Sequence, residues 1–258
     1  MRQRRRVFRA IPLSAVTIVL TYSVNCTSTP NLNNRPCPCD TGWSCCERLQ
    51  ICLPDGDVCG ATYFVSPSGN DANDGLSATT PWESFETAWP AMLPGDTLVL
   101  LDGVYTRQLN IAISGAEGSP ITVRAQNDGG AIIDGENIRV PCRFGGNANN
   151  PSQYLHVEGL SCRRGLDITV FVVYTTHSVV RRVTGADVVQ DDRAPTIFSF
   201  WHADDLLVED VAASGQGTHL FSSLESDNMT FRRCWGKWVS ANDPGTVQTQ
   251  PIPWHPTL

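Results

Sequence analysis

Short segments that alternate apolar and polar residues recur along the chain from about residue 62 onward. Five of them place an apolar residue, any residue, an apolar residue and then polar or small residues in the same order. Their central apolar residues follow one another at steps of 34, 23, 28 and 23 residues, and are Val123, Val157, Val180, Val208 and Phe231. Strand-rich repeats of this length are typical of a solenoid, in which each coil covers the apolar face of the previous one. The pattern therefore predicts an all-β fold, a parallel β-helix lined by these five side chains.

The residue that follows each central position is charged, and its sign alternates along the series Arg124, Glu158, Arg181, Glu209 and Arg232. Coils in parallel register lie about 4.8 Å apart, so these residues are expected to form one outward column of opposite charges. Such a column fixes the register of the coils. We therefore predict a structural rather than a catalytic role for its arginines.

A short helix is predicted before the repeats. Thr80 is a candidate N-cap, Pro81 suits the first helical position, and Glu83 completes a capping box. Large apolar residues then follow at helical spacing, namely Trp82, Phe85, Trp89 and Met92. A solenoid must cover the open end of its first coil, and we expect this helix to do so.

Residues 37–60 form a small cysteine-rich module. A segment this short cannot bury a core of its own, so disulfides are the expected source of stability. Six cysteines allow 15 pairings, and the spacing does not choose among them. Zinc is an alternative that the absence of histidines and of two-residue gaps disfavours. We interpret the module as a spacer, with glycan binding through Trp43 as the alternative; its cysteines are Cys37, Cys39, Cys45, Cys46, Cys52 and Cys59.

The first 25 residues have the pattern of an export signal. Five arginines precede an apolar run, Ala10–Leu20, that is shorter than the roughly 20 residues of a membrane-spanning helix. Cys26 follows directly and is a candidate for lipidation and membrane attachment, although Asn25 departs from the small residues usual before a lipidated cysteine. The alternatives are an uncleaved anchor and an unlipidated chain. We predict a secreted or cell-surface protein.

The charge of the exported chain argues against a nucleic-acid partner. The sequence has 19 basic and 26 acidic residues, and removal of residues 1–25 removes five arginines and no acid, which leaves 14 against 26, or a net charge of −12. Such a surface repels polyanions except where a cation or a basic patch intervenes. The predicted organisation is a signal (1–25), a linker (26–36), the cysteine-rich module (37–60), the β-helix (61–240) and an irregular tail (241–258).

Four segments at the start of the repeats carry a family resemblance. Tyr63–Gly75, Pro81–Phe85, Pro94–Tyr105 and Gly115–Val123 closely resemble the N-terminal part of secreted right-handed parallel β-helix proteins of the pectate-lyase superfamily, and the resemblance covers roughly residues 62–240. It implies a right-handed coil and a capped first turn. The superfamily includes lyases, hydrolases, epimerases and adhesins, so the resemblance does not choose an activity.

The lyases of this superfamily remove the proton next to a uronate carboxyl group, which requires a base and a group that neutralises the carboxylate. Lys237 is the only lysine and is our candidate base, because burial lowers the pKa of a lysine more readily than that of an arginine. Its neighbours Trp235 and Trp238 are candidates for sugar stacking, and Arg233 or Arg182 for the neutralising group. The alternative is a surface lysine whose stem packs on aromatic rings.

Calcium is a second candidate for the neutralising group. Asp71, Asn73 and Asp74 offer oxygen ligands in one loop, although loops of this composition are more often simple turns. Further acidic residues fall in connections between coils, where a groove would be built, and these are Asp187, Asp191, Asp192, Asp204 and Asp205.

Inverting hydrolysis is not predicted. Polygalacturonase-like enzymes carry Asn-Thr-Asp, Asp-Asp, Gly-His-Gly and Arg-Ile-Lys motifs, and only Asp191-Asp192 matches. The sequence therefore predicts an exported β-helix protein that binds or processes extracellular polysaccharide, by lyase-type β-elimination on uronate glycans. The alternative is a non-catalytic surface, glycan-binding or adhesin-like protein. No repeat follows Phe231, so a shortened and inactive member of the superfamily is a further alternative.

Overall fold

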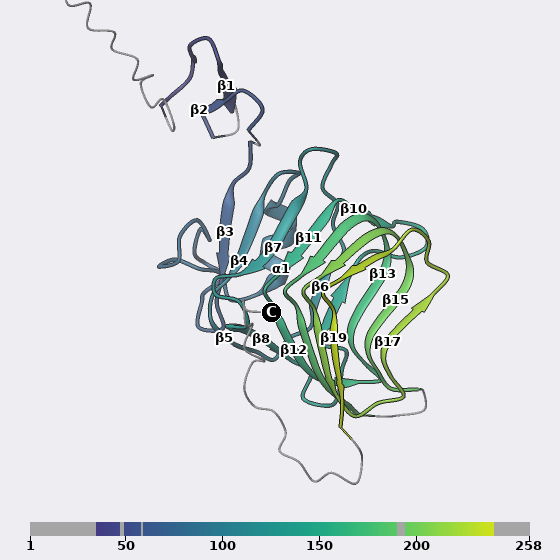
Figure 1. Ribbon diagram of the computed structural model, residues 1–258. Helices are drawn as coiled ribbons and strands as arrows, with labels where there is room; N and C mark the ends of the chain where they lie inside the picture. Colours follow the sequence, from purple (N-terminus) through teal and green to yellow (C-terminus); the bar gives the residue numbers. More distant parts are fainter. Residues whose placement is uncertain (1–34, 47–48, 58, 190–193, 240–258) are drawn as a thin grey trace, which may run out of the picture. The chain divides into compact units, whose positions relative to one another are not determined.

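The computed structural model describes residues 35–46, 49–57, 59–189 and 194–239 (Figure 1). The predicted signal at 1–25, the candidate lipidation site Cys26 and the predicted tail at 241–258 lie outside these residues, as do Asp191 and Asp192. Within the described part of the chain, no helix has the length and apolar character needed to cross a membrane.

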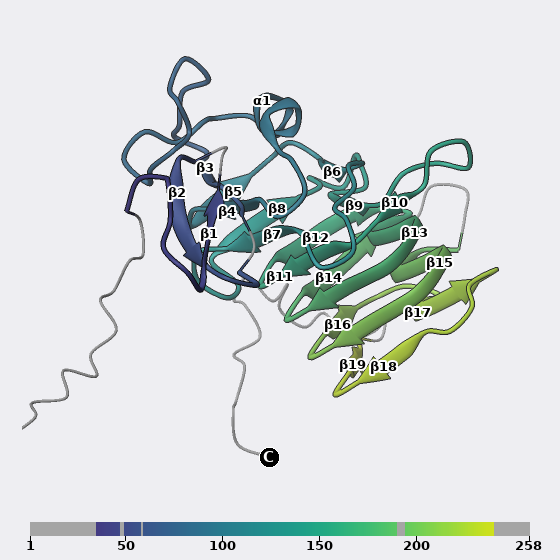
Figure 2. The same ribbon diagram turned by 90° about the horizontal axis from the view of Figure 1, so that it is seen from above.

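Strands of successive coils stack side by side in parallel register, so the prediction of a parallel β-helix is confirmed (Figure 1, Figure 2). We name its three faces sheets A, B and C, in the order in which the chain meets them. Sheet A contains β3 (Thr62–Val65), β4 (Thr97–Leu100), β7 (Ile121–Ala125), β11 (Leu155–Glu158), the second halves of β13 (Ile168–Arg181) and β15 (Thr196–Glu209), and β18 (Thr230–Arg232).

Sheet B contains β5 (Gly103–Tyr105), β8 (Ala131–Asp134), β12 (Ser161–Leu166), β14 (Thr184–Val189), β16 (Ala212–Gly215) and β19 (Trp235–Trp238). Sheet C contains β6 (Leu109–Ile111), β9 (Cys142–Phe144), the first halves of β13 and β15, and β17 (His219–Leu224). The short strand β10 (Ser152–Gln153) pairs with β13 at the corner between sheets C and A.

The five central apolar residues predicted to line the β-helix form one interior column of sheet A. Val123, Val157, Val180, Val208 and Phe231 are direct neighbours in consecutive coils, and Tyr63 and Leu98 extend the same column toward the N-terminus. The four valines are at most 2% exposed, whereas Phe231, in the last described rung, is 44% exposed. Each fully buried side chain of this size contributes about 1.5–3 kcal/mol to folding, so the column is a principal source of stability.

The predicted column of alternating charge is also present. Arg124, Glu158, Arg181, Glu209 and Arg232 are neighbours in register on the outer side of sheet A. Arg181 lies 3.1 Å from Glu209 and 3.8 Å from Glu158, and Arg232 donates to Glu209 at 2.6 Å. The structural role predicted for these arginines therefore has a direct basis in their contacts.

The chain passes from sheet A to sheet B through one left-handed residue in each of four coils. These residues are Gly159, Arg182, Asp210 and Arg233, with φ between 51° and 72°. A left-handed residue other than glycine costs roughly 1–2 kcal/mol, so only a corner that the stacked strands fix on both sides retains it. Arg182 and Arg233 are thus corner residues of the solenoid.

The short helix is confirmed, but its predicted start was wrong. It consists of α1 (Phe85–Ala88) followed by a 3-10 turn (Trp89–Ala91), with Ser84 rather than Thr80 at the N-cap. Trp82 is extended, because its backbone bonds to Phe64 and Ser66 on either side and pairs with β3. Phe85 is 2% exposed and stacks on Tyr105 at 5.4 Å, so the helix covers the core of the first coils.

The cysteine-rich module is an antiparallel hairpin, β1 (Trp43–Cys46) and β2 (Ile51–Pro54), held by three disulfides. The structure chooses one of the 15 pairings left open by the sequence. No thiol of the six remains for zinc, so the disulfide interpretation is confirmed; the pairs are Cys37–Cys45, Cys39–Cys52 and Cys46–Cys59.

Candidate functional site

The two arginines predicted to neutralise a substrate carboxylate lie in one column at the corner between sheets A and B. Arg182 donates to Asp128 at 2.8 Å and to Glu158 at 2.7 Å. Arg233 donates to both oxygens of Asp210, at 2.5 and 2.8 Å, and also contacts Glu209. Both guanidinium groups therefore already neutralise carboxylates of the protein.

The electrostatics of this corner follow from those contacts. Hydrogen bonds from Arg233 hold the pKa of Asp210 below its usual range. Burial raises the pKa of Glu209, but hydrogen bonds from Arg232 and Arg233 outweigh it and the net pKa is lowered. These carboxylates stay ionised at neutral pH and form a network along the stacked corners.

Lys237, Trp235 and Trp238 lie together on β19, the last strand of sheet B. Trp235 and Trp238 are 48% and 53% exposed, and Lys237 is exposed as well. Residues two apart on a strand share a face, so Trp235 and Lys237 point to the same side, opposite to Gly236. Gly236 continues an interior column through Ala213 and Gly185, which places Trp235 and Lys237 on the outer face.

Lys237 differs from the arginines in its lack of an acidic neighbour. No described carboxylate lies within ion-pair distance of its ammonium group. The structure thus places the candidate base and one candidate stacking ring, Trp235, on the same face of β19, whereas Trp238 follows Gly236 on the other face. Its role as a base, like those of Arg182 and Arg233, stays a prediction.

The loop predicted to hold calcium uses its oxygens within the loop. Asp71 accepts hydrogen bonds from the backbone of Glu83 and Ser84 at 2.9 and 2.8 Å and from the Ser84 hydroxyl at 2.7 Å. Asp74 accepts from Thr80 at 2.7 Å and from the backbone of Leu76 at 3.1 Å. The calcium site stays a prediction, and no step proposed below depends on it.

Asn73 and the Trp82 indole complete this loop. The Asn73 amide donates to the Pro81 carbonyl at 2.9 Å, and the Trp82 indole donates to the Asn73 carbonyl at 2.8 Å. Hydrogen bonds from Thr80 hold the pKa of Asp74 below its usual range. The geometry of the loop is therefore explained by its own contacts with the segment that leads into the helix.

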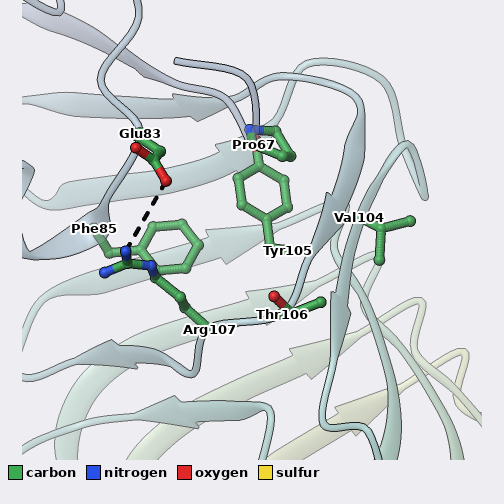
Figure 3. A pocket seen from close by; sticks show the side chains of 7 residues that line it. All are labelled: Pro67, Glu83, Phe85, Val104, Tyr105, Thr106 and Arg107. Atoms are coloured by element: carbon green, nitrogen blue, oxygen red, sulfur yellow. Dashed lines mark ion pairs between the residues drawn. The ribbon is translucent and has the colours of Figure 1, made fainter. Parts of the chain in front are cut away.

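A small pocket lies between the loop after β3, the start of α1 and the end of β5 (Figure 3). Arg107 spans it toward Glu83 at 4.0 Å and lies 3.8 Å from Glu86. Tyr105 donates its hydroxyl to the carbonyls of Val65 and Leu101, and burial raises its pKa. The pocket contains none of the predicted site residues, and its charges compensate one another.

Sequence reasoning missed a group of aromatic side chains on and beside the outer face of sheet C. Phe171, Tyr174, Trp201 and His202 form ring contacts with one another, with centroid distances from 4.6 to 6.4 Å. The available signal was the presence of Phe171 and Trp201 at strand positions where a solvated sheet normally carries polar residues. A buried disulfide, Cys142–Cys162, was also missed and joins sheets C and B.

Known polysaccharide lyases match this chain over part of its length. The family described as chondroitinase B matches residues 82–177. Pectate lyase L of Dickeya dadantii (strain 3937) is 38% identical over 80 residues, which cover 28% of this chain and 19% of that protein. Pectate lyase PEL9 of Emericella nidulans is 36% identical over 83 residues, covering 31% of this chain and 20% of that protein. The matches thus span about a fifth of each curated relative.

Solved structures support the fold. The crystal structure of pectate lyase Pel9A aligns with a TM-score of 0.50 and 22% identity, over 67% of this chain and 47% of that one. A rhamnogalacturonan lyase aligns with the same TM-score and 14% identity, over 69% and 51% of the two chains. The chain is therefore similar, over part of its length, to the pectate lyase and chondroitinase B-like β-helix superfamily.

Proposed function

We propose that this chain is an extracellular protein that acts on uronate-containing polysaccharide through the outer face of β19. The observation that carries the proposal is the ammonium group of Lys237, which has no acidic partner among the described residues and shares the outer face of β19 with the exposed Trp235. Aromatic rings bind the apolar faces of sugars, and a lysine without an acidic partner is available to a ligand carboxylate as the ammonium ion and to a proton as the neutral amine. Similarity to pectate lyases supports the class of polymer.

The proposed chemistry is β-elimination. Lys237, in its neutral form, accepts the proton at C5 of a uronate residue, next to the carboxyl group. The electrons of that C–H bond form the C4–C5 double bond, the C4–O bond breaks, and the leaving oxygen takes up a proton from water. Arg233 is the better placed of the two candidate neutralising groups, because its side chain is 59% exposed against 33% for Arg182.

The disulfides and the predicted export signal agree with this proposal. Four disulfides lie within the described residues, and such bonds persist in oxidising compartments outside the cytosol. Membrane attachment through a lipidated Cys26 and release from the cell are two forms of the same localisation. A test by mass spectrometry of the mature N-terminus distinguishes them.

The test of the chemistry is the incubation of purified protein with a panel of uronate polymers, while the ultraviolet absorbance of newly formed unsaturated ends is recorded. Native protein is expected to produce this absorbance. Lys237→Arg keeps the positive charge but cannot act as the base, so it is expected to bind polymer and not to cleave it. Full turnover by Lys237→Ala would show that another group is the base.

A non-catalytic glycan-binding protein is the second candidate. The observation that favours it is that both candidate neutralising arginines already pair with carboxylates at 2.5–2.8 Å. Binding of polymer by native protein without new absorbance, and loss of that binding in Trp235→Ala, would support this candidate against the lyase.

A further inference from the structure

The last coil that the structure describes presents an open end (Figure 2). Its strands β17, β18 and β19 each pair with a strand of the preceding coil, and no described strand pairs with their other side. The side chains that continue the core into this coil are only partly covered. We name this surface the end face and define it by Leu220, Phe221, Met229, Phe231 and Cys234.

Phe231 shows how the end face differs from the rest of the core. It follows Val208 in the interior column of sheet A, and its exposure is 44% whereas that of Val208 is 0%. Its ring packs edge-on against Phe200 at 5.4 Å between centroids, so the side chain keeps its interior position. Cys234 follows the buried Val211 in the same way at the corner with sheet B. An apolar cross-section beside an unpaired strand edge is typical of a surface that a protein covers.

The backbone of β18 has pairing groups on its open side. The carbonyl of Arg232 accepts a hydrogen bond at 3.0 Å from the amide of Asp210 in the preceding coil. In a parallel ladder, both backbone groups of a residue point to the same neighbouring strand, and the direction alternates from residue to residue. The N–H and C=O groups of Phe231 therefore point to the open side, where a further strand would satisfy them.

The open edge of sheet A carries opposite charges at its two ends. Glu225 and Asp227 are exposed just before β18, and Arg232 and Arg233 are exposed at its end. The two arginines also end the two columns of alternating charge, so an acidic group in a next layer would continue both columns. A two-fold axis through the edge reverses the strand direction, and the acidic end of one copy then meets the basic end of the other. The edge is therefore complementary to itself.

We propose that the end face binds the end face of a second copy of this chain, head to head, on a two-fold axis at Phe231. The two Phe231 residues form a hydrogen-bonded antiparallel pair that uses their free backbone groups. Arg232 lies opposite Thr230 of the second copy, which keeps the arginines apart, and Arg233 lies within reach of Asp227 of that copy. Because the axis passes through one side of a three-sided coil, the other sides exchange, and β17 of each copy meets β19 of the other.

The opposite end of the β-helix explains why the contact closes at two copies. A head-to-tail contact would require an open coil there, but α1 covers the core of the first coils, with Phe85 2% exposed and stacked on Tyr105. An isologous contact uses the same surface of both copies and leaves no part of it for a third. The inference does not rest on the proposed function, because its test measures association and not turnover.

The first experiment measures the molar mass of the full chain by sedimentation over a range of concentrations. Native protein is expected to form a dimer in equilibrium with monomer. Asp227→Lys places a cation opposite Arg233 of the second copy, so it is expected to raise the dissociation constant of the dimer about tenfold or more. Glu117→Lys makes the same change of net charge on an exposed turn before β7, and it is the matched control, expected to dimerise as native protein does.

The second experiment locates the axis by cross-linking. In a Cys234→Ala background, Phe231→Cys places one thiol of each copy on the axis, at the Cα separation of about 5.5 Å that a disulfide spans. This variant is expected to form a disulfide-linked dimer under mild oxidation. Leu76→Cys in the same background carries its thiol on an exposed loop before α1 and is expected not to link. Melting curves of the reduced variants check that they fold.

The remaining outcomes contradict the inference. Native protein that stays monomeric at every concentration does not associate through the end face. If the Phe231 amide of that monomer is also protected from hydrogen exchange, residues after Val239 or another segment of the same chain cover the edge. A molar mass that grows without limit indicates an open array of copies instead of a closed dimer. A dimer that Asp227→Lys leaves intact and Phe231→Cys does not link forms through another surface.

Discussion

Arg233 and Asp210, corner residues of consecutive coils, form a two-point contact in which Nε and Nη2 of the arginine donate to the two carboxylate oxygens at 2.5 and 2.8 Å. Arg182 occupies the same corner one coil before Asp210 but pairs with Asp128 and Glu158 instead. The corner column thus alternates in charge, as the outer column of sheet A does. Two arginines that look equivalent in the sequence therefore differ in their partners and in their exposure.

This difference predicts different effects of the two arginines on the proposed lyase. Arg182→Gln is expected to lower the melting temperature, because Asp128 and Glu158 lose their partner, and to leave kcat/KM on a uronate polymer unchanged. Arg233→Gln is expected to lower kcat/KM as well, since its more exposed side chain is the proposed neutralising group. Steady-state ultraviolet assays beside melting curves measure both. A loss of kcat/KM in Arg182→Gln at an unchanged melting temperature would contradict this assignment.

Asp134 is a buried carboxylate of sheet B and is predicted to be important for stability. It is 1% exposed and accepts hydrogen bonds from Arg163 at 2.8 Å and from Arg164 at 2.7 Å. Asp134→Asn keeps the shape but removes the charge that two guanidinium groups share, which is expected to cost about 2 kcal/mol. Urea unfolding at pH 7 measures it. An unchanged midpoint and slope would show that solvent replaces these contacts.

The loop at Asp71 offers a test of calcium against a purely structural role. Asp71→Asn removes a charged acceptor of the Glu83 and Ser84 amides, so the melting temperature is expected to fall whether or not calcium is present. Melting curves of the native chain with calcium and with a chelator provide the comparison. A calcium-dependent rise in melting temperature that Asp71→Asn abolishes would establish the metal site; equal curves would exclude stabilisation by calcium.

The interior of the solenoid could be predicted from the sequence because burial restricts which residues occur there. Val123, Val157, Val180 and Val208 recur at the steps that stacking imposes, and a one-residue slip in any coil would turn an apolar side chain into solvent. The charged neighbours follow from the same register. The apolar position and its charged neighbour, repeated in each coil, are therefore sufficient to predict the register of sheet A.

The features that the sequence did not predict depend on contacts between distant segments. The helix begins at Phe85 rather than near Pro81 because β3 holds Trp82 extended and the side chain of Asp71 accepts the amides of Glu83 and Ser84. Of the aromatic group on sheet C, Tyr174 and His202 could not be placed from the sequence, because their left-handed backbone takes them out of the strand alternation. The disulfide pairing was open because 15 pairings have the same sequence signature.

Asp187 is predicted to destabilise the native fold at neutral pH. Burial raises the pKa of its carboxyl, and the opposing effects of Arg163 and Arg164 do not cancel the rise. A carboxyl whose pKa is higher in the folded state favours folding at pH values below its unfolded pKa, about 3.9, and that contribution is lost as the pH rises through the folded pKa. Asp187→Asn stays neutral throughout and tolerates the left-handed backbone at this position, so it is expected to melt above native protein at pH 7.

The expected advantage of Asp187→Asn decreases as the pH is lowered and disappears below pH 4 or so, where the native carboxyl is protonated in both states. Asp134→Asn is the matched control, because the pKa of Asp134 is lowered: burial raises it, and hydrogen bonds from Arg164, Glu136 and Arg163 outweigh that effect. The loss of stability in Asp134→Asn, relative to native protein, is greatest at neutral pH and shrinks as the pH falls through the lowered pKa of Asp134. Between pH 3 and pH 7, the advantage of Asp187→Asn and the disadvantage of Asp134→Asn in melting temperature should therefore both grow as the pH rises. A loss of stability in Asp187→Asn at pH 7 would mean that Arg163 and Arg164 stabilise the charged form after all.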